Sequence, residues 1–277
     1  MDQKKLDFIK ANGRIVKVKA GEIVRFDTDT SHHYWLNEVY KYSLTAFLSE
    51  AGPVPARLKD WFQNNTKEEA DQRLELTGSL GTKMHEAFER SLNGEELNLL
   101  TEYTTIREKK ILTSFADWFQ AWKPKELESE QIVASEELDI AGTLDYKANY
   151  GRENLLLDFK TTGGIYFNHF LQALGLANMY NESRGEHIDF AGIARFGTIH
   201  KGTGKINTVK IGDRELPLSG KGWEVKMVPD YIDWGTFKGV YNTFLALNKG
   251  KVPEPEEIEA FPEVIRLFEN VKKEENV

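Results

Sequence analysis

A strand-like run of three leucines, Leu155 to Leu157, ends in an aspartate and a lysine two residues apart, Asp158 and Lys160. Side chains of a strand alternate between its two faces, so Asp158 and Lys160 are expected on the same face. Charged groups at the end of a buried strand cost free energy unless they are paired or bind a ligand. The pattern therefore predicts either a satisfied ion pair or a functional site.

A hairpin brings a second aspartate to this place. Gly151-Arg152 precedes the leucine strand, and glycine at the first of two loop positions is typical of a type II′ turn. Counting back from the turn pairs Tyr150 with Glu153 and places Asp145 directly opposite Asp158. On that register the Cβ atoms of the two aspartates are about 5 Å apart.

Two carboxylates this close usually share a proton, a cation or a nearby lysine. The chain has no cysteine, which excludes zinc–thiolate sites and iron–sulfur clusters, so Mg²⁺ or Mn²⁺ held by oxygen ligands is the natural candidate. Lys160 would then orient or deprotonate a water, or stabilise charge on a phosphate. The alternative is a structural Asp–Lys–Asp cluster, and a register shift of one residue would turn one aspartate away.

The clearest helical pattern covers residues 79–92, with Ser79 as a candidate N-cap and Asn93-Gly94 as the stop. Its apolar residues recur at steps of four: Leu80, Met84, Phe88 and Leu92. His85 falls at the edge of this apolar stripe. By itself, such a histidine is more often a hydrogen-bonded core residue than a metal ligand.

These blocks together resemble the PD-(D/E)XK nuclease superfamily. The stretches 142–145 (GTLD) and 158–160 (DFK), followed by a helix opening near Gln172, are most similar to its RecB-like branch, which includes phage and mitochondrial single-strand exonucleases. The upstream stretch 81–89 (GTKMHEAFE) fits the G-T-x-x-H-x-x-x-E pattern of that branch at every defined position. The resemblance covers roughly residues 40 to 182.

The resemblance implies a role for each matched residue. The implied metal ligands are His85, Asp145, Asp158 and the main-chain carbonyl of Phe159. Lys160 would position the attacking water, and Gln172 would lie at the site from the following helix. Glu89, one turn beyond His85, would lie behind the ligands or bind an additional ion.

One position departs from the family pattern. The family helix carries Gln-x-x-x-Tyr, whereas Leu176 stands four residues after Gln172 and a tyrosine follows only at Tyr180. If the family tyrosine contacts the DNA backbone, that contact is missing or supplied elsewhere. The proposed ligands are unaffected.

The remaining periodicity predicts the elements that must position these residues. Short strands are expected before residue 40, including a hairpin around Ala20-Gly21 and a strand at 32–36. Ser43 is a possible N-cap, and Gly78 is expected to close a helix. Helices are expected at 44–52, 57–65, 67–76, 79–92, 96–122 and 166–183, and strands within 132–149, 153–161 and 189–197.

This order of helix, three strands, helix and strand predicts an α/β fold: a PD-(D/E)XK restriction-endonuclease-like core with helical additions. We expect a single nuclease domain over residues 1–277. Within it, residues 1–78 form N-terminal strands and helices, 79–200 the catalytic core, and 201–277 a hairpin and C-terminal helices.

Several other side chains are expected to be incidental to the site. Adjacent residues of a strand face opposite ways, which argues against joint metal binding by His32 and His33. His169 lies three residues before Gln172, where core or surface use is more common than phosphate contact. Trp118 and Trp122, four residues apart, predict a helix face packed on the core.

Composition limits the class of protein. The net charge of −8 argues against a broadly basic surface that coats nucleic acid, although residues 195–226 carry a local excess of Lys and Arg. No apolar run is long enough to span a bilayer, and the first residues lack the apolar core of a signal peptide. A cytoplasmic protein without a membrane partner is therefore expected.

The expected function is that of a metal-dependent deoxyribonuclease, an exonuclease that acts on DNA ends in phage or bacterial recombination or repair. Its DNA would be single-stranded or have free ends, and a recombination or single-strand-binding protein is an expected partner. Three alternatives remain: a structure-specific endonuclease, a nucleic-acid-binding protein with a decayed site, and a metal-dependent hydrolase of a small phosphate ester.

Overall fold

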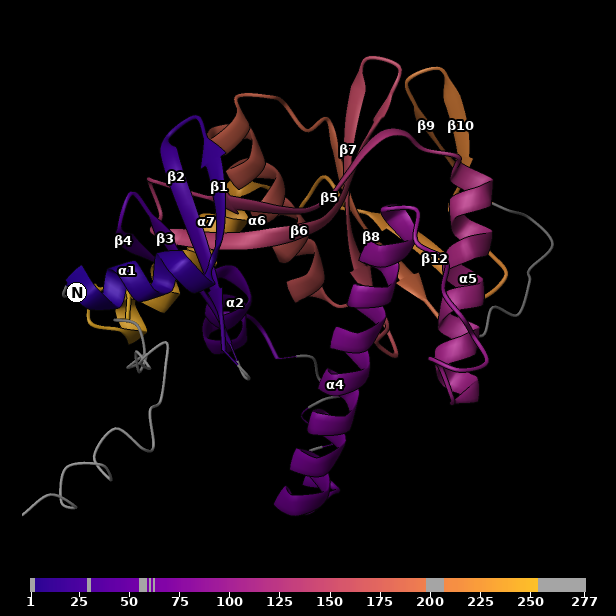
Figure 1. The fold of residues 1–277 in the computed structure, drawn as a ribbon, viewed down its shortest axis with the longest axis horizontal. Coiled ribbons are helices and arrows are strands. Elements are labelled where there is room, and N and C mark those ends of the chain that lie inside the picture. The colour runs from indigo at the N-terminus through magenta and orange to yellow at the C-terminus, as the bar shows by residue number, and fades with distance from the viewer. Residues whose placement is uncertain are drawn as a thin grey trace, which may run out of the picture.

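The computed structural model describes residues 3–253, apart from residues 29–30, 55–58, 60, 62 and 198–206. These residues form a mixed α/β protein around a sheet of ten strands (Figure 1). The helices are α1 (Gln3–Asn12), α2 (Leu44–Ala51), α4 (Lys67–Leu92), α5 (Ile106–Trp122), α6 (Phe167–Arg184) and α7 (Trp234–Leu247). The strands are β1 (Arg14–Val18), β2 (Gly21–Asp27), β3 (His32–Leu36), β4 (Val39–Ser43), β5 (Lys125–Ala134), β6 (Ile140–Tyr150), β7 (Glu153–Lys160), β8 (Phe190–Phe196), β9 (Thr208–Ile211), β10 (Arg214–Pro217), β11 (Ser219–Gly220) and β12 (Trp223–Met227).

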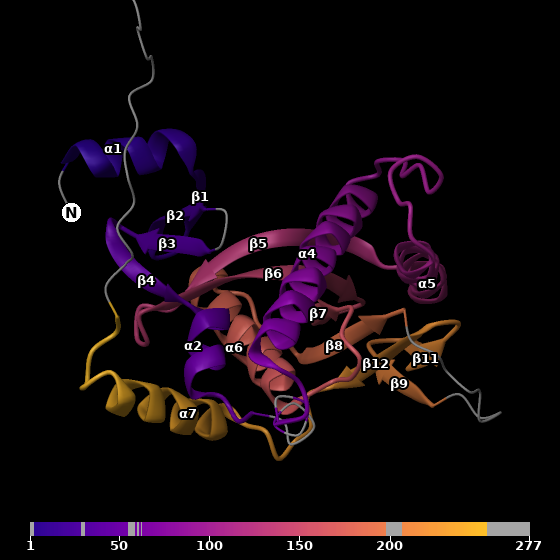
Figure 2. The ribbon, with the colours of Figure 1, turned by 90° about the horizontal axis from the view of Figure 1, so that it is seen from below.

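Helices cover the sheet on both faces: α4 and α5 lie on one side, and α2, α6 and α7 on the other (Figure 2). The alternation of β7 divides its side chains between these layers. Leu155, Leu157 and Phe159 join the core under α4 and α5, whereas Leu156 joins the core under α6 and α7. Asp158 is therefore expected to point to the α6 side of the strand.

The predicted hairpin of β6 and β7 is confirmed. Backbone pairs run from Tyr150–Glu153 to Tyr146–Leu157, and Gly151 has the positive φ of 69° that the first position of the turn requires. The order of helix, three strands, helix and strand is also confirmed, as α5, β5 to β7, α6 and β8. The pairing of Asp145 with Asp158 lies one step past the last backbone pair.

The sheet is open at one place along β6. β5 pairs with one edge of β6 along most of its length. On the other edge, β4 pairs in parallel with only the first two residues, and β7 pairs only from Tyr146 onward. Among the described strands, residues 142–145 therefore have no partner on that edge, and the carboxyl ends of β4 and β7 point toward this gap.

The predicted helix end at Gly78 and N-cap at Ser79 are wrong, because α4 runs unbroken through both residues. The predicted division between residues 1–78 and 79–200 therefore falls inside this helix. A helical glycine costs only about 1 kcal/mol relative to alanine. The real N-terminus is capped by Thr66, which exchanges hydrogen bonds with Glu69 in a capping box.

Other boundaries also differ from the predictions. α5 begins at Ile106 instead of residue 96, because Thr105 and Glu108 form a capping box there. The sequence patterns missed α1. Ser43 precedes α2 as predicted but makes no side-chain cap hydrogen bond. Of the helix predicted at 57–65, residues 57, 58, 60 and 62 lie outside the described residues, and Lys59, Trp61 and Gln63 are helical. Residues 201–206 and 254–277 also lie outside the described residues.

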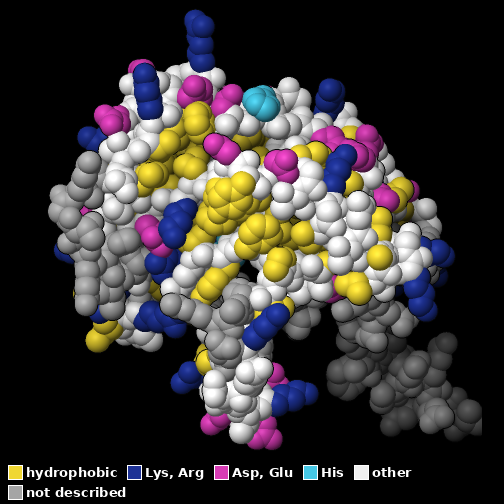
Figure 3. Space-filling model, turned by 180° about the vertical axis from the view of Figure 1, so that it is seen from behind, with side chains coloured by type: hydrophobic (Ala, Val, Ile, Leu, Met, Phe, Trp, Pro, Cys, Tyr) yellow, Lys and Arg dark blue, Asp and Glu magenta, His cyan; other side chains and the backbone are white. Residues whose placement is uncertain are grey.

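The predicted core face of α5 is confirmed, since Trp118 and Trp122 are fully buried. On the side of the molecule turned away in Figure 1, apolar side chains gather in patches among charged ones (Figure 3). Within the part of the chain that the structure describes, no helix combines the length and the apolar character needed to cross a membrane.

The close packing of α6 on α7 leads to a stability prediction. A Cβ atom on Gly175 of α6 would lie 2.6 Å from the buried ring of Phe237 on α7. We therefore expect Gly175→Ala to lower the free energy of unfolding by about 1–3 kcal/mol, measured by urea denaturation. Gly239 of α7 has open space around the same position. As the matched control, Gly239→Ala should stabilise by about 0.5–1 kcal/mol, and an equal loss in both variants would contradict the packing argument.

Candidate active site

A cleft of about 720 Å³ opens at the gap between β4 and β7. It brings together most of the residues singled out in the sequence. The predicted residues that line it are His85, Glu89, Asp145, Lys160 and Gln172. Glycines and short side chains of α4 and the start of α2 complete its walls, including Gly78, Gly81, Thr82, Ser43 and Thr45. The cleft is therefore reached from both helical layers, by α4 on one side of the sheet and by α6 on the other.

Asp145 is held by two neighbours. One carboxylate oxygen accepts a hydrogen bond from the backbone N–H of Phe159 at 2.6 Å, and the other lies 3.1 Å from Nδ1 of His85. In the first of these bonds, the carboxylate is the acceptor in place of a backbone carbonyl of β6, at the point where β6 and β7 stop pairing. Because Nδ1 of His85 donates to a carboxylate, the Nε2 atom of the ring is the one left to accept or to bind a ligand.

Asp158 and Lys160 form a close ion pair, with Oδ2 of the carboxylate 2.6 Å from Nζ of the lysine. Asp158 is 1% exposed and does not line the cleft, whereas Lys160 does. The contact lacks hydrogen-bond geometry, so Oδ2 of Asp158 is a buried oxygen that has a charged neighbour but no hydrogen bond. The two side chains share a face, as the alternation predicts.

Phe159 fixes the strand between these charges. Its ring is 1% exposed and packs edge-on against Phe88, Phe115 and Trp118 of the aromatic core under α4 and α5. In an extended strand the N–H and C=O of one residue project to the same side. The carbonyl of Phe159 is therefore expected on the side of Asp145, where its N–H already points.

Burial and neighbouring charges shift the pKa values of the site carboxylates. Burial raises the pKa of Asp158 and the charge of Asp145 adds to this, while Lys160 opposes it. Burial also opposes ionisation of Asp145, but His85, Lys160 and the N–H of Phe159 outweigh it and lower the pKa of that carboxyl. The pKa of His85 is raised, because Asp145 outweighs the effect of burial.

The structure adds residues that the sequence patterns did not assign to the metal site. Arg25 and Tyr34, from β2 and β3, line the cleft, and Arg25 donates to Oγ1 of Thr143 at 2.9 Å. Glu130 of β5 also lines it, with a left-handed backbone (φ 49°) that is rare for a residue other than glycine. No sequence pattern indicates that backbone conformation. The alternation of side chains on β2, in contrast, does predict that Arg25 and Asp27 lie on the same face.

His32 was expected to be incidental, but it lines the cleft, with Nδ1 2.8 Å from Oδ1 of Asp27. His33 points the other way into a buried position, so the two rings do not act together. His169 does not line the cleft. Burial beside Lys160 and Arg195 lowers the pKa of His169 to about 3.

The departure at Leu176 has a structural counterpart. Leu176 lines the cleft and lies against Gly142, where a Cβ atom would be 3.0 Å from its methyl group. Tyr180 does not replace the family tyrosine, because it is buried with its hydroxyl near Glu128 and Glu186, outside the cleft lining. The cleft does contain a tyrosine, Tyr34, which comes from the N-terminal strands.

No three His, Asp or Glu side chains of the described residues are arranged to hold a metal ion as they stand. Asp145 is engaged by His85, and Asp158 by Lys160. The donor set nevertheless suits a hard divalent cation, since it offers two carboxylates, an imidazole nitrogen and a backbone carbonyl. A lining with four carboxylates but two Lys or Arg side chains favours an added cation.

No protein-family model and no curated protein matches the chain. A crystal structure from Eubacterium rectale, described as a "putative exonuclease", is similar at 13% identity and a TM-score of 0.43, over 77% of this chain and 84% of that chain. A likeness of this size does not establish a common fold.

Glu130 provides a test of the electrostatics of the cleft. Burial raises its pKa to about 7, with further contributions from Asp145 and Glu89 that Arg25 partly offsets. The unfolded value is about 4.3. The proton held by folded Glu130 therefore stabilises the protein at low pH, and this contribution is lost as the pH rises from about 4.3 through about 7.

Glu130→Gln removes this titration. The free energy of unfolding of the variant minus that of the wild type should therefore increase by on the order of 2 kcal/mol between pH 5 and pH 8, measured by urea denaturation in EDTA. Glu126 lies on the same strand with the same φ of 49° but is exposed, and Glu126→Gln is the control. A difference that does not change with pH would show that Glu130 is not held protonated.

Proposed function

We propose that the protein is a metal-dependent deoxyribonuclease that hydrolyses DNA phosphodiesters from an end of the strand. The proposal includes the PD-(D/E)XK assignment and its RecB-like branch, because the matched residues stand in the element order of that family. One observation carries it: His85, Asp145, Lys160 and Gln172, which are distant in sequence, line one cleft at the gap in the sheet, with Asp158 directly behind Lys160.

The metal site would consist of His85, Asp145, Asp158 and the carbonyl of Phe159, with Glu89 beside it. When bound, Mg²⁺ or Mn²⁺ supplies positive charge to the phosphate and to the leaving oxygen, and lowers the pKa of water. The acidic lining explains why such an ion is needed, because a polyanionic substrate would otherwise meet more negative than positive charge.

The side chains of the protein have separate tasks. Lys160 lines the cleft, where its ammonium group would hold the attacking water and stabilise the hydroxide as it forms. Gln172 reaches the cleft from α6, where its amide can donate to the water or to a phosphate oxygen. Ser43, Leu44 and Thr45 line the cleft at the start of α2, and the N–H groups of a helix N-terminus favour an anion.

The substrate and setting are the part of the proposal that rests on the family resemblance. DNA that is single-stranded or has free ends is the proposed substrate, in recombination or repair in the cytoplasm. A recombination or single-strand-binding protein is the proposed partner. An endonuclease, a decayed site and a hydrolase of small phosphate esters predict different outcomes in the same assay.

The assay compares 5′-labelled, 3′-labelled and circular DNA, single- and double-stranded, with Mg²⁺, Mn²⁺ or EDTA. We expect cleavage of linear DNA that requires the metal, and a loss of kcat of at least about 100-fold in Lys160→Ala and in Asp158→Asn. Lys226→Ala, at an exposed strand position outside the cleft lining, is the control and should retain activity.

Each alternative has its own result. Cleavage of circles would indicate an endonuclease, and turnover of a small phosphate ester without any cleavage of DNA would indicate the small-molecule hydrolase. DNA binding without metal-dependent cleavage would contradict the enzymatic proposal and leave a binding protein.

Metal binding can be tested apart from activity. An ion at about 100 times its Kd should stabilise the wild type by about 2.7 kcal/mol, which a melting curve with and without Mn²⁺ would detect. Asp158→Asn should lose this gain, because it removes the central ligand. Asp213→Asn, outside the cleft, should keep it. Equal stabilisation of all three proteins would place the ion elsewhere.

A further inference from the structure

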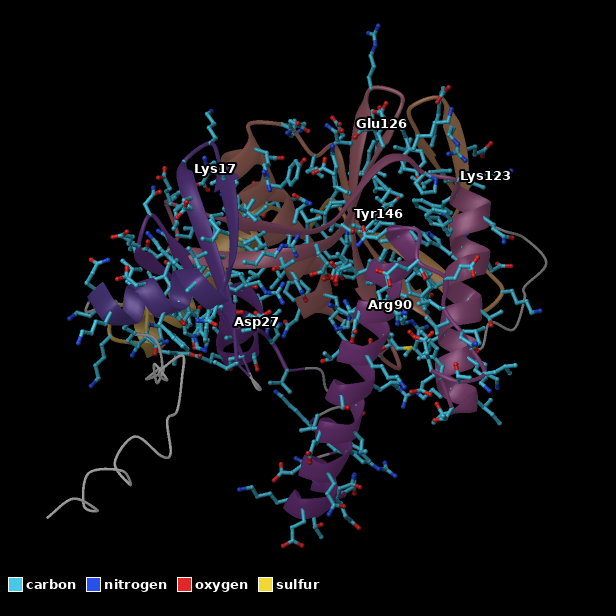
Figure 4. All side chains as sticks on the ribbon, viewed as in Figure 1. Lys17, Asp27, Arg90, Lys123, Glu126 and Tyr146 are labelled. Atoms are coloured by element: carbon cyan, nitrogen blue, oxygen red, sulfur yellow. The ribbon has the colours of Figure 1, made fainter. Side chains whose placement is uncertain are left out.

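One face of the hairpin of β2 and β3 runs from the apolar core at one end to the cleft at the other. Its pairs on this face are Ile23–Leu36, Arg25–Tyr34 and Asp27–His32. The first pair is buried with apolar residues of β5 and β6. Arg25, Tyr34 and His32 of the next two pairs line the cleft. Figure 4 shows Asp27 near the end of β2, on the side of the N-terminal strands toward α4.

The hydrogen bonds of Arg25 leave one of its amino groups available. Nε donates to Oδ1 of Asp27 at 2.8 Å, and Nη1 donates to Thr143 and lies 3.5 Å from Glu130. Nη2 lies 3.3 Å from Nδ1 of His32, but that nitrogen is 2.8 Å from the carboxylate of Asp27 and therefore carries a hydrogen. One N–H of Nη2 is thus directed at a ring nitrogen that cannot accept, and among the described residues the other N–H of Nη2 has no acceptor.

We infer that Arg25 binds a phosphate of the substrate strand, next to the phosphate that is cut, through the N–H groups of Nη2. This inference rests on the proposed function and names a binding residue that the family motifs do not include. The guanidinium of arginine is suited to the task, because its planar N–H groups match phosphate oxygens and it stays charged.

The position of Arg25 agrees with a neighbouring phosphate. Arg25 is bonded to Thr143, which stands two residues before Asp145 on β6, or about 7 Å along the strand. Phosphates of an extended nucleic-acid strand repeat on a similar scale. A nucleic-acid strand that runs along β6, with its reacting phosphate at Asp145 and Lys160, would therefore bring the next phosphate to Arg25.

Asp27 and Thr143 hold the guanidinium in place before any substrate arrives, so little side-chain freedom is lost on binding. The groups that face Arg25 include two carboxylates, Asp27 and Glu130, besides His32. Because these carboxylates offset its charge, the directed N–H groups matter more than net charge. Arg25→Lys keeps the charge but cannot make all these contacts at once, so its affinity for the substrate should be little better than that of Arg25→Gln.

The test measures steady-state cleavage of a single-stranded oligonucleotide by the full-length protein. Arg25→Gln should raise KM about tenfold or more and change kcat less than about threefold, as expected for the loss of one charged hydrogen-bonded contact. In a Lys160→Ala background with Mg²⁺, which keeps the proposed metal ligands but should not turn over, the slope of log Kd for the oligonucleotide against log salt should fall by about 0.7 on adding Arg25→Gln, the value for one phosphate of a single strand.

Arg184→Gln is the matched control. Arg184 donates to the carbonyl of Lys17 and to Gln131, so it also joins the N-terminal strands to β5, but it does not line the cleft. KM and the salt slope should stay at the wild-type values in Arg184→Gln. Melting curves of both variants would show that they are folded.

Three outcomes would overturn the inference. A wild-type KM and salt slope in folded Arg25→Gln would remove Arg25 from the binding surface and leave the proposed function intact. An equal loss in Arg184→Gln would show that docking of the N-terminal strands, and not phosphate contact, is responsible. A wild type that neither binds nor cuts nucleic acid would overturn both the inference and the proposed function.

Discussion

The hydrogen bond from the N–H of Phe159 to the carboxylate of Asp145 determines where the site can form. β6 and β7 pair regularly as far as Tyr146 and Leu157, and then the sheet must accommodate the gap beside β4. A buried N–H without an acceptor would cost about 1–3 kcal/mol. Asp145 supplies that acceptor from a side chain, which lets β6 and β7 part without loss and leaves a cleft at the gap between β4 and β7.

The aromatic core holds the other end of this bond in place. Phe159 packs among rings from α4, α5 and β8, so its backbone cannot easily shift away from Asp145. The same strand carries Asp158 and Lys160 on its opposite face. Rigid packing on one face therefore positions the charged pair on the other, which is what a site that must hold reacting groups in a fixed geometry requires.

The charges of the cleft compensate one another in pairs: Asp158 with Lys160, Asp145 with His85, and Glu130 with Arg25. Each pair lowers the cost of burying its carboxylate. In each pair, an added cation would compete with the basic side chain for the carboxylate, and an added phosphate would compete with the carboxylate for the basic side chain. In the proposed function, an ion that binds Asp158 would free Lys160, and in the further inference a phosphate would approach Arg25 where its Nη2 has no acceptor.

The sequence by itself determined the local parts of this arrangement. Turn chemistry at Gly151 and the alternation of β7 predicted the register that brings Asp145 near Asp158, because both signals depend on residues close in the chain. Helical periodicity placed His85 correctly. The same periodicity misplaced the helix boundary at Gly78, because a single glycine costs too little to end a helix that is capped at Thr66.

Only the tertiary structure decided which distant elements meet at the gap. The parallel pairing of β4 with β6 joins segments about a hundred residues apart, and it brings Arg25 and Tyr34 to the cleft. No local pattern specifies such a pairing. An apolar face on a strand indicates that the face is buried, but it does not indicate which element covers it. The left-handed backbone of Glu130 is likewise a feature that no local pattern predicted, because a residue other than glycine adopts it only where the surrounding structure holds it there.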